Sequence, residues 1–552
     1  MSYISEKICS EITEIIKEKF GIEAEEGLVM VETPRDVKMG DYSTNIAMRL
    51  ARTLRRKPRD IAADLLEDIQ KRIPEASSVE IAGGGFINFR ISAQALSTCI
   101  NPIIEAGDAY GSNNSGKGKK VLVEWVSANP TGDLHCGHAR NAAWGDSICR
   151  LMEKSGYDVL REFYVNDAGN QIRMLGESLI SRYFEYFGKE YPLPEDGYHA
   201  EDVKEIAYEI AREDGDKWLN ADPEERRNYF METGKAKELK KIEKDLELYR
   251  VHMESWCHET FFYANGRKRI NACLARMEEL GLLYEKDGAL WFKSTDYGDD
   301  KDRVLRKSDG TLSYLTPDIA NHVYKVERGY TKLVDLWGAD HHSYITRMQA
   351  ALKALGYPED TLSVDIIQMV RMVEDGVEVK MSKRTGNAIT LRELCEDVGV
   401  DAARWFFVSK DVATHMDFDF KLAKKKDNSN PVYYAQYAYS RMHSIMDNPE
   451  IPPLQVCESY KRLTDEKELR LLKMISEFPD VTADAALVRK PNKITDYIIS
   501  LVKEYHSYYN SSKVNNPDDP ELTNERLALT KAVMVTLKNA LDLVGVSAPE
   551  RM

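Results

Sequence analysis

Two histidines flank a short run early in the chain, His135-Cys136-Gly137-His138. A spacing of three residues places both imidazoles on one face of a helix. The N-terminus of a helix attracts anions through its free N–H groups and its dipole. Gly137 lacks a Cβ, so a flat ring such as adenine could lie against its backbone. The run predicts a phosphate-binding site, although two ordinary polar residues beside a turn would give the same pattern.

A second run, Lys380-Met381-Ser382-Lys383, is followed directly by Arg384. Three cations within five residues, next to small polar residues, suit a loop that folds over pyrophosphate oxygens. A solvated basic loop is the alternative interpretation. Neither run alone identifies an activity, but the two in this order point to one site for a phosphate chain.

The elements around these runs predict how they are positioned. A strand-like run at 121–126 precedes a turn at 129–132, and a helical pattern from about 135 to 155 follows. Strand, turn and helix in this order are typical of the start of a parallel nucleotide-binding sheet. Further strand-like runs lie at 289–292, 332–340 and 364–373.

The pattern along the chain predicts four regions and one insertion. The Gly-, Ser- and Lys-rich stretch 107–120 reads as a linker. We expect an α/β fold: a Rossmann-type parallel-sheet catalytic core, an α+β N-terminal domain and an all-helical C-terminal bundle. The expected bounds are 1–110 for the N-terminal domain, 118–370 for the core with a charged helical insertion at about 185–255, 371–427 for the second run and its connection, and 428–552 for the bundle.

Composition narrows the class of protein. The chain has 552 residues, a formal net charge of −15 and no apolar run long enough for a bilayer. It begins without signal-peptide features, so we expect a cytoplasmic protein with no membrane contact. The acidic balance alone argues against nucleic-acid binding, but a polyanion responds to local patches. Eight scattered cysteines without a C-x-x-C pair, and adjacent histidines at 341 and 342 without further ligands, predict no metal site.

The two runs together resemble the signature motifs of the class I aminoacyl-tRNA synthetases. The flanking segments resemble the arginyl-tRNA synthetase family over almost the whole chain: ANPTGDLHCGHARNAAWGDS, REFYVNDAGNQI, RKSDGTLSYLTPDIA, WGADHHSYITRM, NPVYYAQYAYSR and VGVSAPERM. MGDYSTNIA and GGGFINF resemble that family's N-terminal domain. Gly84 departs from the proline that the family often has there, which affects only a loop.

The resemblance implies a reaction and its partners. The protein would activate L-arginine with ATP, release pyrophosphate, and esterify arginine to a 2′ hydroxyl at the 3′ end of its tRNA, with tRNA needed for efficient activation. Mg²⁺ would arrive with ATP, and the protein would be a monomer. The catalytic residues would be His135, His138, Lys380 and Lys383. The ATP-binding set would add Gly137, Met372, Met381 and Ser382.

The resemblance also implies an arginine pocket, and a guanidinium requires carboxylates placed for forked hydrogen bonds. Glu124 and Asp318 would supply them, and Tyr314 would share a helix face with Asp318. Ser127 and Asn129 would hold the amino and carboxylate groups, with Asp340 and His341 nearby. From the residues alone, Glu124 could instead be an outward-facing charge at a strand end, and Asp318 an ordinary helix-start carboxylate.

The expected tRNA contacts come from two regions. Phe86 and Asn88 match family positions at the tRNA elbow, where an exposed aromatic ring could stack on a splayed base; a core position for Phe86 is the alternative. In the helical tail the candidates are Tyr433, Gln436, Tyr437 and Arg441, with bundle core as the rival interpretation for the tyrosines. Two other functions stay open: another class I synthetase such as the cysteinyl type, or a non-catalytic paralogue that binds tRNA or senses arginine.

Overall fold

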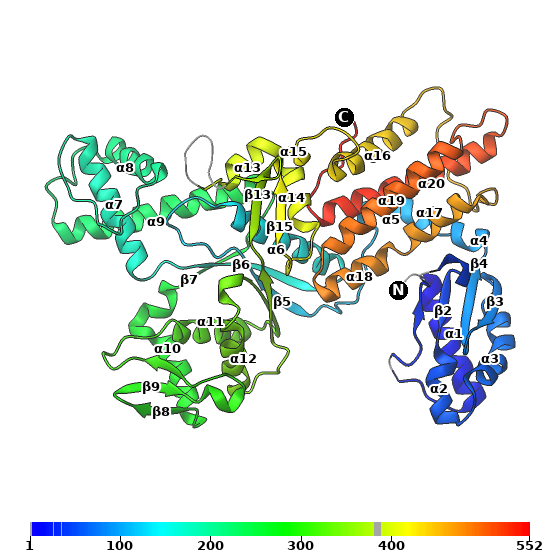
Figure 1. Ribbon diagram of the computed structural model, residues 1–552, viewed down its shortest axis with the longest axis horizontal. Coiled ribbons are helices and arrows are strands. Elements are labelled where there is room, and N and C mark those ends of the chain that lie inside the picture. Colours follow the sequence, from blue (N-terminus) through cyan, green and yellow to red (C-terminus); the bar gives the residue numbers. More distant parts are fainter. Residues whose placement is uncertain (1–2, 26, 35, 380–387) are drawn as a thin grey trace.

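The computed structural model describes residues 3–25, 27–34, 36–379 and 388–552. Its N-terminal domain packs three helices on a four-stranded antiparallel sheet of order β1-β2-β4-β3 (Figure 1). The elements are α1 (Tyr3–Phe20), α2 (Ile46–Leu54), α3 (Pro58–Arg72), β1 (Val31–Glu32), β2 (Tyr42–Thr44), β3 (Ala76–Ala82) and β4 (Phe86–Ile91). Gly85 has φ +128° and a Cβ there would lie 2.8 Å from Pro58, so only glycine fits this turn between β3 and β4.

The core of the molecule is a parallel sheet, as the sequence predicted, and it has five strands in the order β12-β11-β5-β6-β7. The strands are β5 (Lys120–Glu124), β6 (Asp158–Val165), β7 (Ser255–His258), β11 (Lys332–Gly338) and β12 (Leu362–Ile367). Alternation along β5 divides the core: Leu122 packs on one face of the sheet, and Val121 and Val123 on the other.

Helices cover both faces of this sheet (Figure 1). The face of Leu122 packs against helices that follow β7 and precede β12. The opposite face packs against the long helix that follows β5, and two helices beyond residue 390 pack against that helix in turn. The helices are α10 (Thr260–Glu279), α11 (Leu315–Glu327) and α12 (Tyr344–Ala354) on the first face, and α6 (Cys136–Lys154), α13 (Leu391–Val398) and α14 (Val400–Val408) on the second.

A helical lobe with its own core is inserted between β6 and β7. It consists of α7 (Asn170–Tyr186), α8 (Glu201–Asp214) and α9 (Pro223–Leu248). The lobe begins before the expected residue 185, because the apolar face of α7, with Leu175 and Leu179, packs against α8 and α9 rather than on the sheet.

One strand-like run, and the second half of another, lie in sheets other than the five-stranded core. Residues 289–292 form a strand of a separate antiparallel sheet of order β10-β9-β8. Residues 364–373 are divided between β12 and β13, which belong to different sheets, with Gln368 and Met369 between them. The elements are β8 (Leu283–Lys286), β9 (Ala289–Phe292), β10 (Arg303–Arg306), β13 (Val370–Glu374), β14 (Val377–Glu378) and β15 (Met416–Asp419).

The C-terminal region is a helical bundle, and none of its residues lies in a strand. Its helices are α16 (Pro431–Met446), α17 (Glu466–Ser476), α18 (Phe478–Val488), α19 (Asn492–Ser511) and α20 (Pro520–Leu543). Short helices α4 (Ala93–Ser97) and α5 (Ile100–Ala106) join the N-terminal domain to this bundle.

The segment after α20 returns to the catalytic core, where it meets a fully buried guanidinium. Arg404 on α14 donates to the carbonyl oxygens of Val544 at 3.1 Å and Tyr249 at 3.0 Å, and pairs with Asp146 at 2.5 Å. Gly545 has φ +67°, and a Cβ there would lie 2.2 Å from Arg404 Nε. The last residues of the chain are therefore part of the core's packing.

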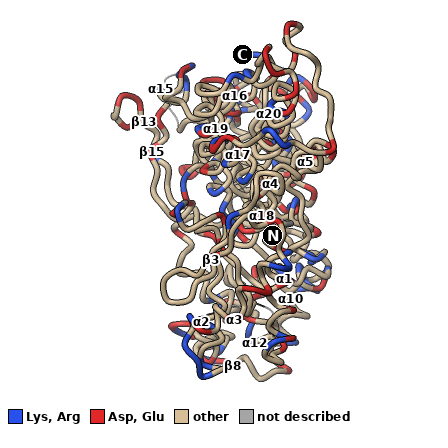
Figure 2. The backbone as a smooth tube through the Cα atoms, turned by 90° about the vertical axis from the view of Figure 1, so that its right-hand side faces the viewer, with Lys and Arg blue, Asp and Glu red and all other residues tan. Residues whose placement is uncertain are grey.

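Acidic and basic residues are interspersed along the length of the molecule (Figure 2). None of the helices within the described ranges is both long and apolar enough to span a bilayer.

Candidate functional site

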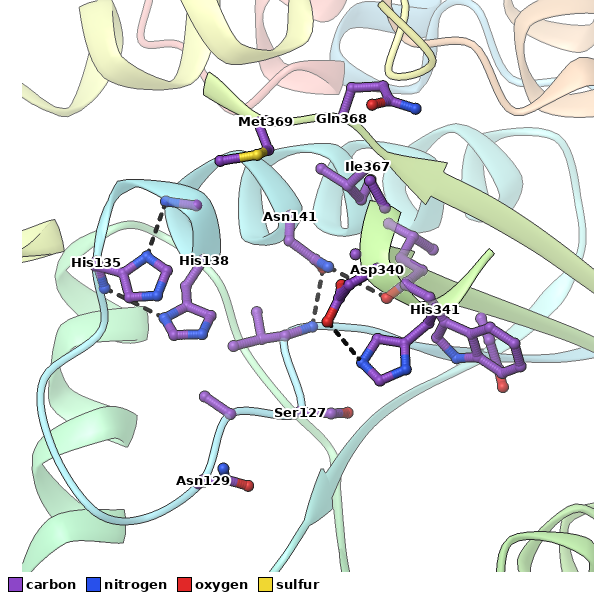
Figure 3. Close-up of a pocket in the computed structure, with 18 of the residues that line it drawn as sticks. Ser127, Asn129, His135, His138, Asn141, Asp340, His341, Ile367, Gln368 and Met369 are labelled. Carbon is purple, nitrogen blue, oxygen red and sulfur yellow. Dashed lines mark hydrogen bonds and ion pairs between the residues drawn. The ribbon is translucent and has the colours of Figure 1, made fainter. Parts of the chain in front are cut away.

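A cavity of about 920 Å³ opens at the carboxyl edge of the parallel sheet, beside the N-terminus of α6 (Figure 3). This edge is where open α/β sheets bind ligands. Its lining includes ten of the fifteen residues that the sequence assigned to catalysis, ATP and arginine: Glu124, Ser127, Asn129, His135, Gly137, His138, Asp318, Asp340, His341 and Met372.

The two histidines form a stacked pair at the start of α6, with ring centroids 3.9 Å apart (Figure 3). His135 Nδ1 accepts the N–H of Gly137 at 3.1 Å, and His138 Nδ1 accepts the N–H of His135 at 3.2 Å. Burial lowers the pKa of His135, and burial with the neighbouring ring lowers the pKa of His138 to about 3. Both rings are therefore neutral, and with Nδ1 accepting, each carries its proton on Nε2 as a donor.

Gly137 makes room for this pair. A Cβ at this position would lie 3.0 Å from the ring of His135, which is tighter than ordinary packing. The sequence assigned the missing Cβ to an adenine ring; in the structure its immediate use is to let the His135 imidazole fold over the first turn of α6.

The loop before α6 is attached to the segment that follows the second run. Leu391 donates its backbone N–H to Leu134 at 2.7 Å, Cys136 donates to Ile389 at 3.3 Å, and His135 and Thr390 form an antiparallel bridge. Lys380, Met381, Ser382 and Lys383 lie outside the described residues. The residues that bracket that gap, Val379 and Ala388, both line the cavity.

The turn at the end of β5 has an unusual backbone. Val126 and Ser127 have φ of 64° and 43°, the left-handed region that costs a β-branched residue most. Asn141 on α6 stabilises it: its Oδ1 accepts the Val126 N–H at 2.9 Å, and its Nδ2 donates to Leu336 at 3.2 Å. Asn141 thereby ties the ends of β5 and β11 together and aims Ser127 into the cavity (Figure 3).

The floor of the cavity is an acidic cluster around one buried cation. Lys325 is fully buried, with Nζ 2.7 Å from Glu124 Oε2 and 3.2 Å from Asp335 Oδ1. His322 bonds Asp335 Oδ2 through Nε2 at 2.8 Å. Burial raises the pKa of Glu124 and Lys325 opposes that rise. Glu124 therefore faces inward, which decides against an outward-facing charge.

Asp318 lies beside this cluster in the first turn of α11. Its Oδ2 accepts the Tyr344 hydroxyl at 2.6 Å. Burial raises the pKa of Asp318, against the lowering effect of that hydrogen bond. Tyr314 does not line the cavity: it is the N-cap residue of α11 and its side chain is 87% exposed, so its assignment to the arginine pocket stays a prediction.

Asp340 and His341 lie on the rim in a short 3-10 turn after β11, with 3.3 Å between Asp340 Oδ2 and His341 Nε2. Both side chains are mostly exposed. Met372 is buried against the cavity, and its carbonyl oxygen accepts the Val379 N–H at 2.8 Å. Of its neighbours, Met369 is exposed and also lines the cavity.

Phe86 and Asn88 lie together on the N-terminal domain. They line a second cavity of about 370 Å³, which they share with the exposed Met39. Phe86 is 40% exposed at the start of β4, which decides against a core position. The Ser43 hydroxyl donates to Asn88 Oδ1 at 2.7 Å.

The α16 candidates differ from one another. Tyr433 and Tyr437 stack at 6.1 Å, with Tyr437 39% exposed, so this pair is not bundle core. The Arg441 guanidinium lies 4.0 Å from the centroid of the Tyr509 ring. Gln436 is buried and donates to Asp401 at 2.9 Å and to the Ser547 carbonyl at 3.0 Å. The Gln436 amide thus anchors the C-terminal segment, and its assignment to tRNA binding stays a prediction.

Sequence reasoning missed four residues that shape the site: Asn141, His322, Lys325 and Tyr344. Asn141 follows His138 by three residues on the same helix, so helical spacing could have indicated it. Lys325 follows Asp318 by seven residues, which is also a same-face spacing, but a buried lysine has no sequence signal of its own.

A family model described as "tRNA synthetases class I (R), catalytic domain" matches residues 100–421, more than half of the chain. With the parallel sheet and the histidine pair at its carboxyl edge, this match places the chain among the class I aminoacyl-tRNA synthetases. An "Arginyl tRNA synthetase N terminal domain" matches residues 6–91 and a "DALR anticodon binding domain" residues 435–552.

Relatives at high identity define the family. An arginine–tRNA ligase of Bacillus anthracis is 51% identical over 540 residues, 98% of this chain and 97% of the relative. An arginine–tRNA ligase of Bacillus subtilis is 49% identical over 556 residues, 99% of this chain and 100% of the relative. The chain belongs to the arginyl-tRNA synthetase family. Thermus thermophilus arginyl-tRNA synthetase shares the fold, with a TM-score of 0.74 at 21% identity over 99% of this chain and all of that one.

Proposed function

We propose that this protein is an arginine–tRNA ligase that activates L-arginine with ATP and then transfers arginine to the 3′ end of its tRNA. The observation that carries the proposal is the composition of one cavity. Neutral imidazole donors stand at a helix N-terminus on one side, and the inward-facing carboxylates Glu124 and Asp318 stand on the other. The first group suits a triphosphate and the second suits a guanidinium.

In the first step, the arginine carboxylate attacks the α-phosphorus of ATP in line, and pyrophosphate leaves. The Nε2–H groups of His135 and His138 donate to phosphate oxygens without adding a formal charge, and the α6 dipole supplements them. Glu124 and Asp318 hold the guanidinium, while Ser127 and Asn129 orient the amino acid's other end. Lys380 and Lys383 neutralise the leaving group; their placement stays a prediction from the sequence.

Mg²⁺ would enter this site with ATP. Within the described ranges no group of three or more His, Cys, Asp or Glu side chains is placed to hold a metal ion. The cavity's donor set instead suits an ion held mainly by phosphate oxygens and water, where it would neutralise phosphate charge. The chain's own residues then have only to position the phosphates.

In the second step, a ribose hydroxyl of tRNA, the 2′ hydroxyl by family resemblance, attacks the arginyl-adenylate. We assign Phe86 to stacking on an exposed tRNA base, because its ring is 40% exposed and lines a cavity on the N-terminal domain. Asn88 would bond the same nucleotide. On α16, we assign tRNA contact to three further residues: Tyr433, Tyr437 and Arg441. A monomeric state and a cytoplasmic location remain predictions.

Arginine-dependent exchange of pyrophosphate into ATP, with and without tRNA, tests the proposal. We expect exchange with arginine and tRNA, and none with lysine or cysteine. Exchange with cysteine instead would support the alternative class I enzyme. Folded protein that binds tRNA or arginine without any exchange would support a non-catalytic paralogue and refute the proposal.

A further inference from the structure

The longest helix of the inserted lobe, α9, presents a stripe of charged residues to the catalytic core. Lys235, Glu238, Lys241 and Asp245 follow at spacings of three or four residues, which places them on one face of the helix. In Figure 1, α9 runs from the lobe toward the centre of the molecule. Through this stripe, the inserted lobe forms ion pairs with segments that lie beside the cavity.

Each end of the stripe contacts a segment beside the cavity. Lys235 Nζ lies 3.4 Å from Asp167, which directly follows the cavity-lining Asn166 after β6. At the other end, Asp245 pairs with Arg392, two residues beyond the Thr390 that bridges to His135.

The middle of the stripe contacts the loop that carries the histidines. Lys241 Nζ lies 2.6 Å from Asp133 and 2.8 Å from Asp202 on α8. Asp133 precedes His135 by two residues, and the intervening Leu134 is fully buried. Lys241 thus pairs directly with Asp133, and only Leu134 separates Asp133 from His135 along the chain.

The charges around Lys241 show why its ion pair with Asp133 holds that residue in place. Three carboxylates surround the single ammonium of Lys241: Asp133, Asp202 and Glu238, at 2.6, 2.8 and 3.9 Å. Glu238 is fully buried, neither of its oxygens has a hydrogen-bond partner within the described ranges, and burial raises its pKa to about 7. Without Lys241 the acids would repel one another, and Asp133, the most exposed of the three, would move.

We propose that Lys241 is a positioning residue for the ATP site: by holding Asp133, it fixes the loop that places His135 and His138, so the inserted lobe sets the geometry of nucleotide binding. This inference rests on the proposed function, since it takes the histidine pair as the phosphate-binding group. Lys241 itself does not line the cavity.

Lys241→Met tests this, with Lys237→Met as a matched control. Lys237 is on the same helix and pairs with two acids of α8, Glu209 and Glu213, both at 3.2 Å, away from the cavity. We expect Lys241→Met to raise the KM for ATP in pyrophosphate exchange about tenfold, because small misplacements are costly. The KM for arginine should change less than about twofold, and Lys237→Met should change neither constant.

Two further variants separate positioning from folding. Lys241→Arg should restore most of the ATP affinity, since it keeps the charge. Asp133→Asn should weaken ATP binding in the same direction, and its effect should not add to that of Lys241→Met, as for residues acting through one contact. Equal losses for ATP and arginine, or equal losses in Lys237→Met, would overturn the proposal. Calorimetric titration with ATP gives the same comparison without turnover, so it decides the inference even if no arginine exchange occurs.

Discussion

The backbone of His135 pairs with that of Thr390 in an isolated antiparallel bridge. These residues are far apart in the sequence, yet the bridge joins the helix start that carries the histidine pair to the chain that follows the lysine-rich second run. Leu391 strengthens the connection through its hydrogen bond to Leu134. A displacement of either segment therefore moves the other, which gives a physical reason for two separate motifs to act on one substrate.

The His138→Asn variant measures the contribution of one imidazole donor. Asparagine retains an acceptor for the His135 N–H but loses Nε2–H at the ring's far end. We expect kcat for arginine-dependent pyrophosphate exchange to fall roughly 10²-fold, as for the loss of one donor to a developing charge. His252→Asn is the control, because His252 is exposed and outside the cavity. A change below about threefold in His138→Asn would exclude a donor role.

The pH dependence of stability tests the neutral state of His138. Its pKa is lowered to about 3 in the fold and returns to about 6.5 in the unfolded chain. Between these values only the unfolded chain binds the proton, so this residue's contribution to stability is present above pH 6.5 and declines as the pH falls toward 3. The melting temperature of wild type should therefore fall more between pH 7 and pH 5 than that of His138→Asn. Parallel shifts in calorimetry would contradict the lowered pKa.

Asp318→Asn tests the guanidinium site. The amide keeps the shape of the carboxylate but loses its charge and one acceptor, and a charged hydrogen bond is worth ~1.5–3 kcal/mol. We expect the KM for arginine to rise at least about tenfold and the KM for ATP to stay constant. Asp360→Asn, at an exposed position, serves as control. Unchanged arginine affinity would show that the guanidinium binds elsewhere.

Lys325→Met removes the buried cation from the cavity floor. Glu124 and Asp335 would then lie buried without their partner, and breaking a buried pair in this way costs about 3–5 kcal/mol. We expect a clear drop in melting temperature, together with weaker arginine binding because Glu124 would take up a proton. Lys332→Met is the comparison, since Lys332 is only half-buried and pairs with the exposed Asp360, 3.6 Å from its carboxylate and 2.5 Å from its carbonyl oxygen. Similar melting temperatures for the two variants would contradict a structural role for Lys325.

Much of the fold follows from local patterns. Alternation in 121–126, the turn after it and the helical period of α6 are properties of a short stretch of chain, so the start of the parallel sheet was predictable. The sheet to which a strand belongs depends on distant partners: residues 289–292 form a strand, but its neighbours place it in a separate antiparallel sheet. The bounds 6–91, 100–421 and 435–552 come from the family models; the bounds expected from the sequence remain predictions.

The site was predictable where chemistry depends on residue type and spacing, as for the histidine pair and Asp318. The site was not predictable where the direction of a side chain decides its role. Tyr314 and Asp318 are four residues apart, but only Asp318 lines the cavity, whereas the Tyr314 side chain is 87% exposed at the N-cap of α11. Gln436 lies between candidate tRNA contacts, but helical rotation buries it against Ser547. Lys325 lies on α11, whereas its partners Glu124 and Asp335 lie on β5 and β11. No local pattern in any of these three elements indicates that they meet.

The buried guanidinium of Arg404 has a consequence for synthesis of the chain. Its carbonyl acceptor at Val544 and the close approach of Gly545 come from residues made long after the catalytic core. During translation, Arg404 can already reach Asp146 and the Tyr249 carbonyl, but it lacks its third acceptor until Val544 has been made, so the packing around this guanidinium is completed only after the core has been synthesised.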